Sequence, residues 1–243
     1  MEFKALGGQN GRQDSVHNCI LCGKPLLYAA KTVMRKCAVC QRMEPSNAAC
    51  EAGHFVCDTC HTQDGGEIRT FLLQSKETDP IKLYLETVAM HQVHLHGPEH
   101  HSIIPCVLLA AYHNCGGQID REACISEAWK RGCKVAGGAC GFLGACGAAV
   151  GAGIFISILC DATPLAGDVW DQPQRMVADS LSRIVETGGP RCCKRTGRQA
   201  IEAAAAFVKE RYGVEMPLSR PACTYSGLNG ECIRTRCPYF ERV

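Results

Sequence analysis

GGACGFLGACGAAVGAG, residues 137–153, sets two cysteines, Cys140 and Cys146, among glycines and alanines. Small residues let a backbone approach another segment or a bound group closely. A cysteine thiolate is both a nucleophile and a soft metal ligand. The apolar continuation predicts a buried helix over Ala145–Leu159, with Asp161 following shortly after. Because glycines interrupt the run, we interpret it as part of a helical domain and not as a membrane span.

Cysteine dominates the composition, because the 243 residues include 19 cysteines and 9 histidines, with a formal net charge of +2. The opening residues, MEFKALGGQNGRQDS, lack the apolar core of a secretory signal, so we expect a cytoplasmic protein whose thiols stay reduced. Many thiols in a reducing compartment indicate metal binding. The near-neutral charge gives no argument for a membrane surface or a nucleic acid, and no basic–aromatic surface favours nucleic acid either.

The N-terminal part carries the clearest metal-binding pattern. We predict a flexible tail over residues 1–15 and a zinc-binding module over residues 16–65. The candidate zinc ligands are Cys19, Cys22, Cys37, Cys40, Cys50, His54, Cys57 and Cys60. Each Cys-x2-Cys pair fits a tight turn, and two pairs complete a tetrahedron around Zn²⁺. The module is too short to build a hydrophobic core, so we expect one or two zinc ions to stabilise it.

Two ligand pairings remain open for this module. In a zinc ribbon, the first two Cys-x2-Cys pairs bind one ion, and Cys50, His54, Cys57 and Cys60 could close a second site. In a RING-like cross-brace, the first pair joins Cys50 and His54, and the second pair joins Cys57 and Cys60. His61 is a spare ligand, and an iron–sulfur cluster is an alternative occupant of the segment.

A helical domain is expected over residues 66–243, after a polar linker at 62–78. Asp79 and Pro80 have the residue types of an N-cap and a first helical position. Asp120 is predicted to cap another helix, which runs through Arg131. Further helices are predicted over residues 103–111, 174–187 and 197–211. Pro105 is expected in the first turn of the 103–111 helix.

Five histidines gather in HQVHLHGPEHH, residues 91–101, and they are His91, His94, His96, His100 and His101. Gly97-Pro98 favours a turn, so we expect a loop here. Its imidazoles would ligate a transition metal or supply an acid–base pair; a solvated polar loop is the alternative. The candidate catalytic histidines are His94, His96, His100 and His101.

The run RCCKR, residues 191–195, places vicinal cysteines among three cations before a helix. Positive charge and the helix dipole are expected to lower the pKa of Cys192 and Cys193, which makes both candidate catalytic residues. Anions also favour such a position. The candidate anion-binding residues are therefore Arg191, Lys194 and Arg195, and an ordinary basic first turn is the alternative.

The C-terminal tail contains Cys223, Cys232 and Cys237 in an irregular segment typical of a metal clamp. A Cys-Pro dipeptide, here Cys237-Pro238, is common beside iron–sulfur clusters. The remaining cysteines show no paired spacing, and we interpret them as structural. These are Cys106, Cys115, Cys124, Cys133 and Cys160.

Four motifs carry a resemblance to a known family: HxHGPEHH, GGxCGFxGACGAA, GGPRCCKR and CPYF. Here they are residues 94–101, 137–149, 188–195 and 237–240. The chain from about residue 17 to 240 resembles an uncharacterised family of anaerobe proteins that joins a zinc-ribbon-like segment to a helical Cys/His-rich domain. More loosely, residues 100–195 resemble a redox-active family named for its C-GCAxxG-C-C cysteine pattern. The resemblance implies that the four motifs build one site, and it implies sulfur, methyl or redox chemistry by association.

The sequence therefore predicts a small zinc-ribbon or RING-like N-terminal module followed by a mainly all-α domain. The candidate cofactor-binding residues, expected to converge on one pocket with the histidines, are Cys140, Cys146, Cys192, Cys193, Cys223, Cys232 and Cys237. We interpret the protein as a metal-dependent, iron–sulfur redox or sulfur/methyl-transfer enzyme whose partner is an anionic small molecule or a protein. A thiol-based transferase without a cluster, and a metallochaperone or partner-binding accessory protein, are the alternatives.

Overall fold

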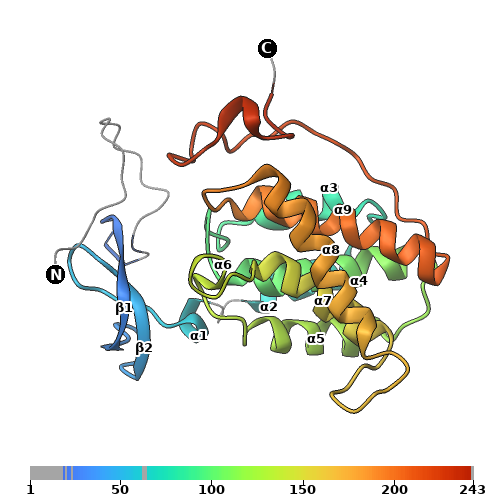
Figure 1. Ribbon diagram of the computed structural model, residues 1–243, viewed down its shortest axis with the longest axis horizontal. Helices are drawn as coiled ribbons and strands as arrows, with labels where there is room; N and C mark the ends of the chain where they lie inside the picture. The colour runs from blue at the N-terminus through green and yellow to red at the C-terminus, as the bar shows by residue number, and fades with distance from the viewer. Residues whose placement is uncertain (1–18, 20, 23, 62–64, 242–243) are drawn as a thin grey trace. The chain divides into compact units, whose positions relative to one another are not determined.

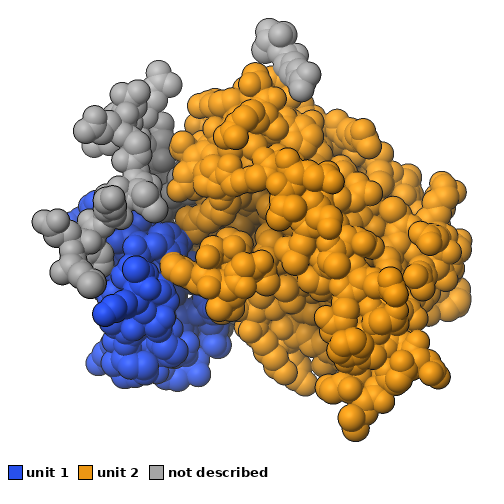
Figure 2. Space-filling model, in the orientation of Figure 1, with its two compact units in different colours: residues 1–61 blue, residues 62–243 orange. Residues whose placement is uncertain are grey.

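The computed structural model describes residues 19, 21–22, 24–61 and 65–241, and the predicted tail at 1–15 lies outside these residues. About half of the chain is helical, and one small sheet is present (Figure 1). The chain divides into two compact units, residues 1–61 and residues 62–243, coloured separately in Figure 2.

The first unit is built on an antiparallel hairpin. Strand β1 (Leu26–Lys36) pairs with β2 (Met43–Cys50), and a short helix, α1 (Asp58–His61), follows. The register runs from Leu26 opposite Cys50 to Lys36 opposite Met43, with an irregularity between Tyr28 and Val33. Among the described residues of this unit, the buried apolar side chains are four cysteines and Ala49.

All regular elements of the second unit's described residues, 65–241, are helices. Its elements are α2 (Gly65–Gln74), α3 (Pro80–Val88), α4 (Glu99–Asn114), α5 (Arg121–Gly132), α6 (Ala139–Phe142), α7 (Gly147–Leu159), α8 (Asp171–Thr187), α9 (Cys193–Tyr212) and the 3₁₀ helix η1 (Arg234–Arg236). Helix α4 is buried along almost its whole length and packs against α2, α3, α5, α7 and α9. Helix α8 packs on α7 and α9.

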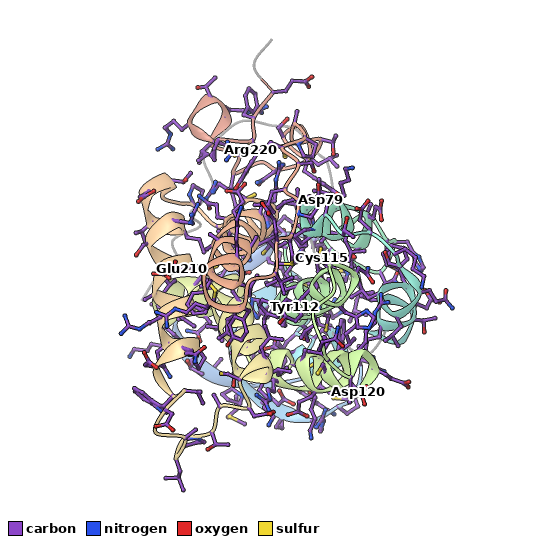
Figure 3. All side chains as sticks on the ribbon, turned by 90° about the vertical axis from the view of Figure 1, so that its right-hand side faces the viewer. Asp79, Tyr112, Cys115, Asp120, Glu210 and Arg220 are labelled. Atoms are coloured by element: carbon purple, nitrogen blue, oxygen red, sulfur yellow. The ribbon has the colours of Figure 1, made fainter. Side chains whose placement is uncertain are left out.

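Several sequence predictions of local structure are confirmed. The expected buried helix at 145–159 is α7, although the most buried helix of the unit is α4. Asp79 caps α3, since its carboxylate accepts N–H bonds from Ile81 and Lys82. Asp120 caps α5 through the Ala123 N–H. Both capping aspartates are labelled in Figure 3.

The linker predicted at 62–78 is wrong over residues 65–74, which form α2. Ile68 and Leu72 recur at a helical spacing of four, and both are buried in the main core. Burial of that short apolar stripe outweighs the polar composition around it. Residues 62–64 lie outside the described part of the chain.

The histidine-rich turn is also shorter than predicted, because α4 begins at Glu99 and includes His100 and His101. Both imidazoles are buried, so they are not part of a solvated loop. Pro105 consequently lies inside α4, not in its first turn. Helix α7 approaches this end of α4 closely, since a Cβ on Gly147 would overlap the His101 ring.

After α9 the chain runs back over the helices as a mostly irregular segment, shown in red in Figure 1. The Ser219 N–H donates to Asp79 over 2.8 Å, and the Tyr225 hydroxyl donates to the Val88 carbonyl over 3.4 Å. Figure 3 labels Asp79 and Arg220, which follows Ser219. These contacts fix the tail against α3, where its cysteines face the start of α9.

Candidate metal centres

The first unit gathers eight side chains into two groups, each able to hold a metal ion such as zinc. One group is Cys19, Cys22, Cys50 and His54, and the other is Cys37, Cys40, Cys57 and Cys60. Within each group the ligand atoms all lie within 4.8 Å of one another. This is the crossed arrangement, one of the two pairings that the spacing allowed.

The distances inside the groups fit a tetrahedral thiolate centre. The sulfurs of Cys22 and Cys50 are 3.8 Å apart, those of Cys37 and Cys60 are 3.9 Å apart, and those of Cys40 and Cys57 are 3.7 Å apart. A zinc–sulfur bond of about 2.3 Å gives a tetrahedron with edges of about 3.8 Å. A disulfide, by contrast, requires sulfurs about 2 Å apart. The residues present therefore fit one zinc-like ion in each group.

The hairpin explains how distant ligands meet. Cys37 follows β1 and Cys50 ends β2, so the two strands deliver one ligand to each group. Backbone N–H groups also point at sulfur: His54 N–H donates to Cys50 over 3.3 Å, and Cys57 N–H donates to Cys37 over 3.4 Å. Such bonds favour the thiolate form that a metal requires.

The thiols of the second group differ in acidity. The Arg42 guanidinium, whose Nε donates to Cys40 Sγ over 3.4 Å, lowers the pKa of that thiol to about 6. Burial and the neighbouring thiols raise the pKa of Cys60 to about 12. Four thiols this close cannot all ionise without a cation among them, so the group is suited to metal binding.

The second unit contains a pocket that four cysteines line, namely Cys192, Cys223, Cys232 and Cys237. Cys192 is the N-cap of α9, and the other three come from the tail. A backbone bond from Cys223 N–H to the Tyr239 carbonyl, 2.8 Å, holds the two ends of the tail together. The Arg234 N–H donates to Cys232 Sγ over 3.4 Å. The apolar remainder of the wall includes Leu85, Leu95 and Phe240.

Three buried cations line the same pocket: Lys194, Arg195 and Arg198, each no more than 3% exposed. In the described part of the chain, none of the three forms an ion pair with an aspartate or a glutamate. Arg198 stacks on the Tyr239 ring, with its guanidinium carbon 3.8 Å from the ring centre. Buried charge without a counter-charge is destabilising, so the pocket is suited to a negatively charged occupant.

A buried polar network lies behind Lys194. The Tyr84 hydroxyl donates to the Cys193 carbonyl over 2.9 Å and also lies 3.2 Å from His100 Nδ1. On the other side of the ring, His100 Nε2 lies 3.0 Å from the His94 carbonyl and 3.2 Å from Lys194 Nζ. Burial and the Lys194 charge lower the pKa of His100 to about 3.

Glu99 and His94 form a second polar pair beside the network. Glu99 accepts from the His94 backbone N–H over 2.9 Å and contacts His94 Nδ1 at 3.1 Å. Burial opposes ionisation of Glu99, but the His94 contact and the charge environment overcome it and lower its pKa to about 2. The His94 carbonyl accepts from Lys194 over 2.8 Å. The histidine motif thus supports the cation at the pocket wall.

The other candidate residues lie outside the pocket lining. Cys193 receives a backbone hydrogen bond from Gly97, and its charge environment includes Arg191 and Cys146. Cys140 likewise lies within the electrostatic influence of Cys146 and Arg191. The Cys193 N–H donates to His96 Nδ1 over 3.4 Å. His101 Nδ1 lies 2.9 Å from the Val135 carbonyl, and His91 is exposed. Of the two vicinal cysteines, Cys192 thus lines the pocket and Cys193 does not.

The predicted acidity of the vicinal thiols is wrong. Burial raises the pKa of Cys192, and it raises the pKa of Cys193 to about 12. The nearby cations act in the opposite direction, but desolvation of a thiolate in this interior is larger. Among the predicted anion-binding residues, Arg191 Nε lies 3.9 Å from a Glu231 carboxylate oxygen.

The cysteines interpreted as structural pack in or beside the main core. Cys106 is part of it, and the partly buried Cys115, Cys124, Cys133 and Cys160 pack against it. Cys115 forms the C-cap of α4 and is labelled in Figure 3.

Sequence reasoning missed Arg198. It lies one helical turn before Ile201, on the stripe that the sequence marks as the buried face of α9. The signal that could have identified it is a charged residue on an otherwise apolar helix face.

The fold and the clustered thiols define a two-unit, cysteine-rich protein with candidate metal centres. The chain belongs to a family of unknown function (DUF5714), whose model matches residues 68–240. No curated protein and no solved structure was found that matches the chain. Among the described residues, no helix is both long enough and apolar enough to cross a membrane.

Proposed function

We propose that the helical unit binds an iron–sulfur cluster through Cys192, Cys223, Cys232 and Cys237, and that the protein functions in electron transfer. The observation that carries the proposal is a single pocket lined by four thiols and by three buried cationic side chains. In the described part of the chain, these cations form no ion pair with a carboxylate. Four thiolates are the usual ligand set of such clusters. Two zinc ions in the first unit would serve as its structural core.

The pocket thiols are not grouped tightly enough to hold a single ion. Among the described residues, no three of these four sulfurs lie within 4.8 Å of one another, whereas the ligand atoms in each N-terminal group do. A mononuclear tetrahedral site needs sulfurs about 3.8 Å apart. Ligands of a polynuclear cluster stand farther apart because the inorganic core lies between them. Cys237 also precedes a proline, as ligands of iron–sulfur clusters often do.

The residues around the pocket favour redox chemistry over thiol-group transfer. If four protein thiolates bind, each iron of a four-iron cluster has its protein ligand, and none is left open for a substrate. Cys193 is the neighbour of Cys192, and its raised pKa makes the Cys193 thiol a weak nucleophile at neutral pH. A cluster supplies one-electron storage. The chain supplies the apolar wall, which limits water, and the fixed cations, which stabilise negative charge.

Anaerobic purification followed by iron, sulfide and zinc analysis tests the proposal. We expect iron and acid-labile sulfide in addition to up to two zinc ions, and visible absorption that bleaches on reduction. Cys192→Ser should lose the iron and keep the zinc. The adjacent Cys193→Ser is the matched control, and it should keep both. A colourless protein containing zinc alone would contradict the proposal.

A further inference from the structure

Two of the three pocket cations have unsatisfied hydrogen-bond donors. Arg195 is 3% exposed and Arg198 is 2% exposed, and the Nε atom of each is buried without a hydrogen-bond partner. Their other hydrogen bonds go to the backbone: Arg195 donates to the Gly188 and Pro190 carbonyls, and Arg198 donates to the Pro221 carbonyl, each over 2.7 Å. A buried N–H on a charged group is destabilising when it has no acceptor. Two such atoms at one pocket indicate an acceptor inside it.

Two oxygen-bearing side chains on the pocket wall already have partners. The Asn229 side-chain carbonyl accepts from Glu231 N–H over 3.0 Å. The Tyr239 hydroxyl donates to Glu202 over 3.1 Å and is turned to that partner. Both guanidiniums line the same pocket as the four cysteine sulfurs, which can also accept hydrogen bonds. A thiolate accepts a charge-assisted N–H bond readily.

Lys194 provides a contrast within the same wall. Its ammonium donates to the His94 carbonyl over 2.8 Å and to the Leu95 carbonyl over 3.2 Å, and it lies 3.2 Å from His100 Nε2. Backbone carbonyls thus hold Lys194 as a fixed charge, whereas the Nε donors of Arg195 and Arg198 have no partner.

We infer that Arg195 and Arg198 donate N–H···S hydrogen bonds to the thiolate-bound centre and stabilise its reduced, more negative state. This inference rests on the proposed iron–sulfur function. When one electron enters from a donor protein or from an electrode, the centre gains one negative charge and no bond is made or broken. Hydrogen bonds to sulfur and nearby positive charge both favour that added electron, so the pair would raise the reduction potential. The two arginines act as positioning residues.

Mediated redox titration of the cluster-loaded, full-length protein tests the inference. Arg198→Gln removes charge and donor, and we expect the reduced-to-oxidised ratio at a fixed potential to fall about tenfold, equivalent to a 59 mV shift to lower potential. Arg198→Lys keeps the charge but not the Nε donor, and an intermediate shift is expected. Arg175→Gln, at an exposed guanidinium on α8, is the control and should titrate as the wild type does.

The outcomes separate this inference from the proposed function. If no variant and no wild-type protein binds iron and sulfide, the proposed function fails. If all bind a cluster and Arg198→Gln keeps the wild-type potential, only the role of the arginines is overturned. An Arg198→Lys variant identical to wild type would overturn the hydrogen-bond assignment. Arg195→Gln gives an independent test should Arg198→Gln fail to fold, and its electron paramagnetic resonance spectrum reports the altered sulfur environment.

Discussion

The two thiol-rich regions of this protein differ in what holds them together. In the first unit the sulfurs lie 3.7–3.9 Å apart in pairs, and the buried apolar residues are mostly the ligands themselves. In the second unit the pocket cysteines stand farther apart, on a helical scaffold with an extensive core around α4. We therefore expect the first region to need a metal ion to fold, whereas the second has a helical scaffold with a core of its own. On the proposed function, cysteine would serve stability in the first region and chemistry in the second.

Metal removal should affect the stability of the two units most differently. Structural zinc supplies roughly 10–16 kcal/mol of apparent binding energy to small modules, so Cys57→Ser or strong chelation should unfold the first unit. The backbone amides of the helical unit should stay protected from hydrogen–deuterium exchange. Exchange measured by mass spectrometry therefore distinguishes the response of the first unit from that of the second. Cys115→Ser, at a partly buried core cysteine, is the control, and continued protection of residues 24–61 after complete metal removal would contradict the expectation.

Acid should affect the helical unit through His100. Its folded pKa is about 3 against an ordinary value of 6.5, so below pH 6.5 the unfolded chain binds a proton that the folded chain does not. Stability is therefore lost as pH falls from about 6.5 to 3, by about 2–3 kcal/mol between pH 7 and 4.5. Glu99, with a folded pKa of about 2, adds a further loss below pH 4.5.

Urea unfolding followed by tryptophan fluorescence measures this effect, because both tryptophans, Trp129 and Trp170, lie in the helical unit. His100→Asn can still hydrogen-bond with Tyr84 but cannot titrate, so its stability should change less between pH 7 and 4.5. Equal pH dependence in the variant and the wild type would show that another group is responsible.

The smallest expected effect compares two helix caps. Asp120 accepts one N–H bond, from Ala123, and Asp120→Ala should cost about 1 kcal/mol. Asp79 caps α3 with two N–H bonds and also accepts from Ser219 in the tail. Asp79→Ala should therefore cost about 2 kcal/mol and loosen the tail. Thermal unfolding gives the first quantity and amide exchange at residues 214–241 gives the second; equal losses in both variants would argue against the tail contact.

Local patterns identified the Cys/His residues that cluster in the first unit and the two helix caps, because these depend on residues close in sequence. The Cys-x2-Cys pairs and the Asp-Pro start of α3 are examples. Pairing in the first unit depends on the register of β1 with β2, which the spacing does not encode. The sequence also gave no measure of burial, so the acidity of Cys193 was predicted with the wrong sign.

The expected convergence of all motifs on one pocket stays a prediction, although the structure puts four of the seven candidate cysteines on one wall. Whether Cys140 and Cys146 act with that centre depends on chemistry that neither motif spacing nor helix periodicity reports. Arg198 was missed because a cation on an apolar stripe looks like an exception until its neighbours are known.

Three of the four pocket sulfurs come from the chain beyond Tyr212, where the described residues, 213–241, contain one regular element, the short η1. The helices before it bury their apolar faces among themselves. If the pocket binds the proposed cluster, such a chain can fold its helical scaffold first and close the last segment over the cluster afterwards. Cluster insertion and folding of the scaffold would then be separate steps.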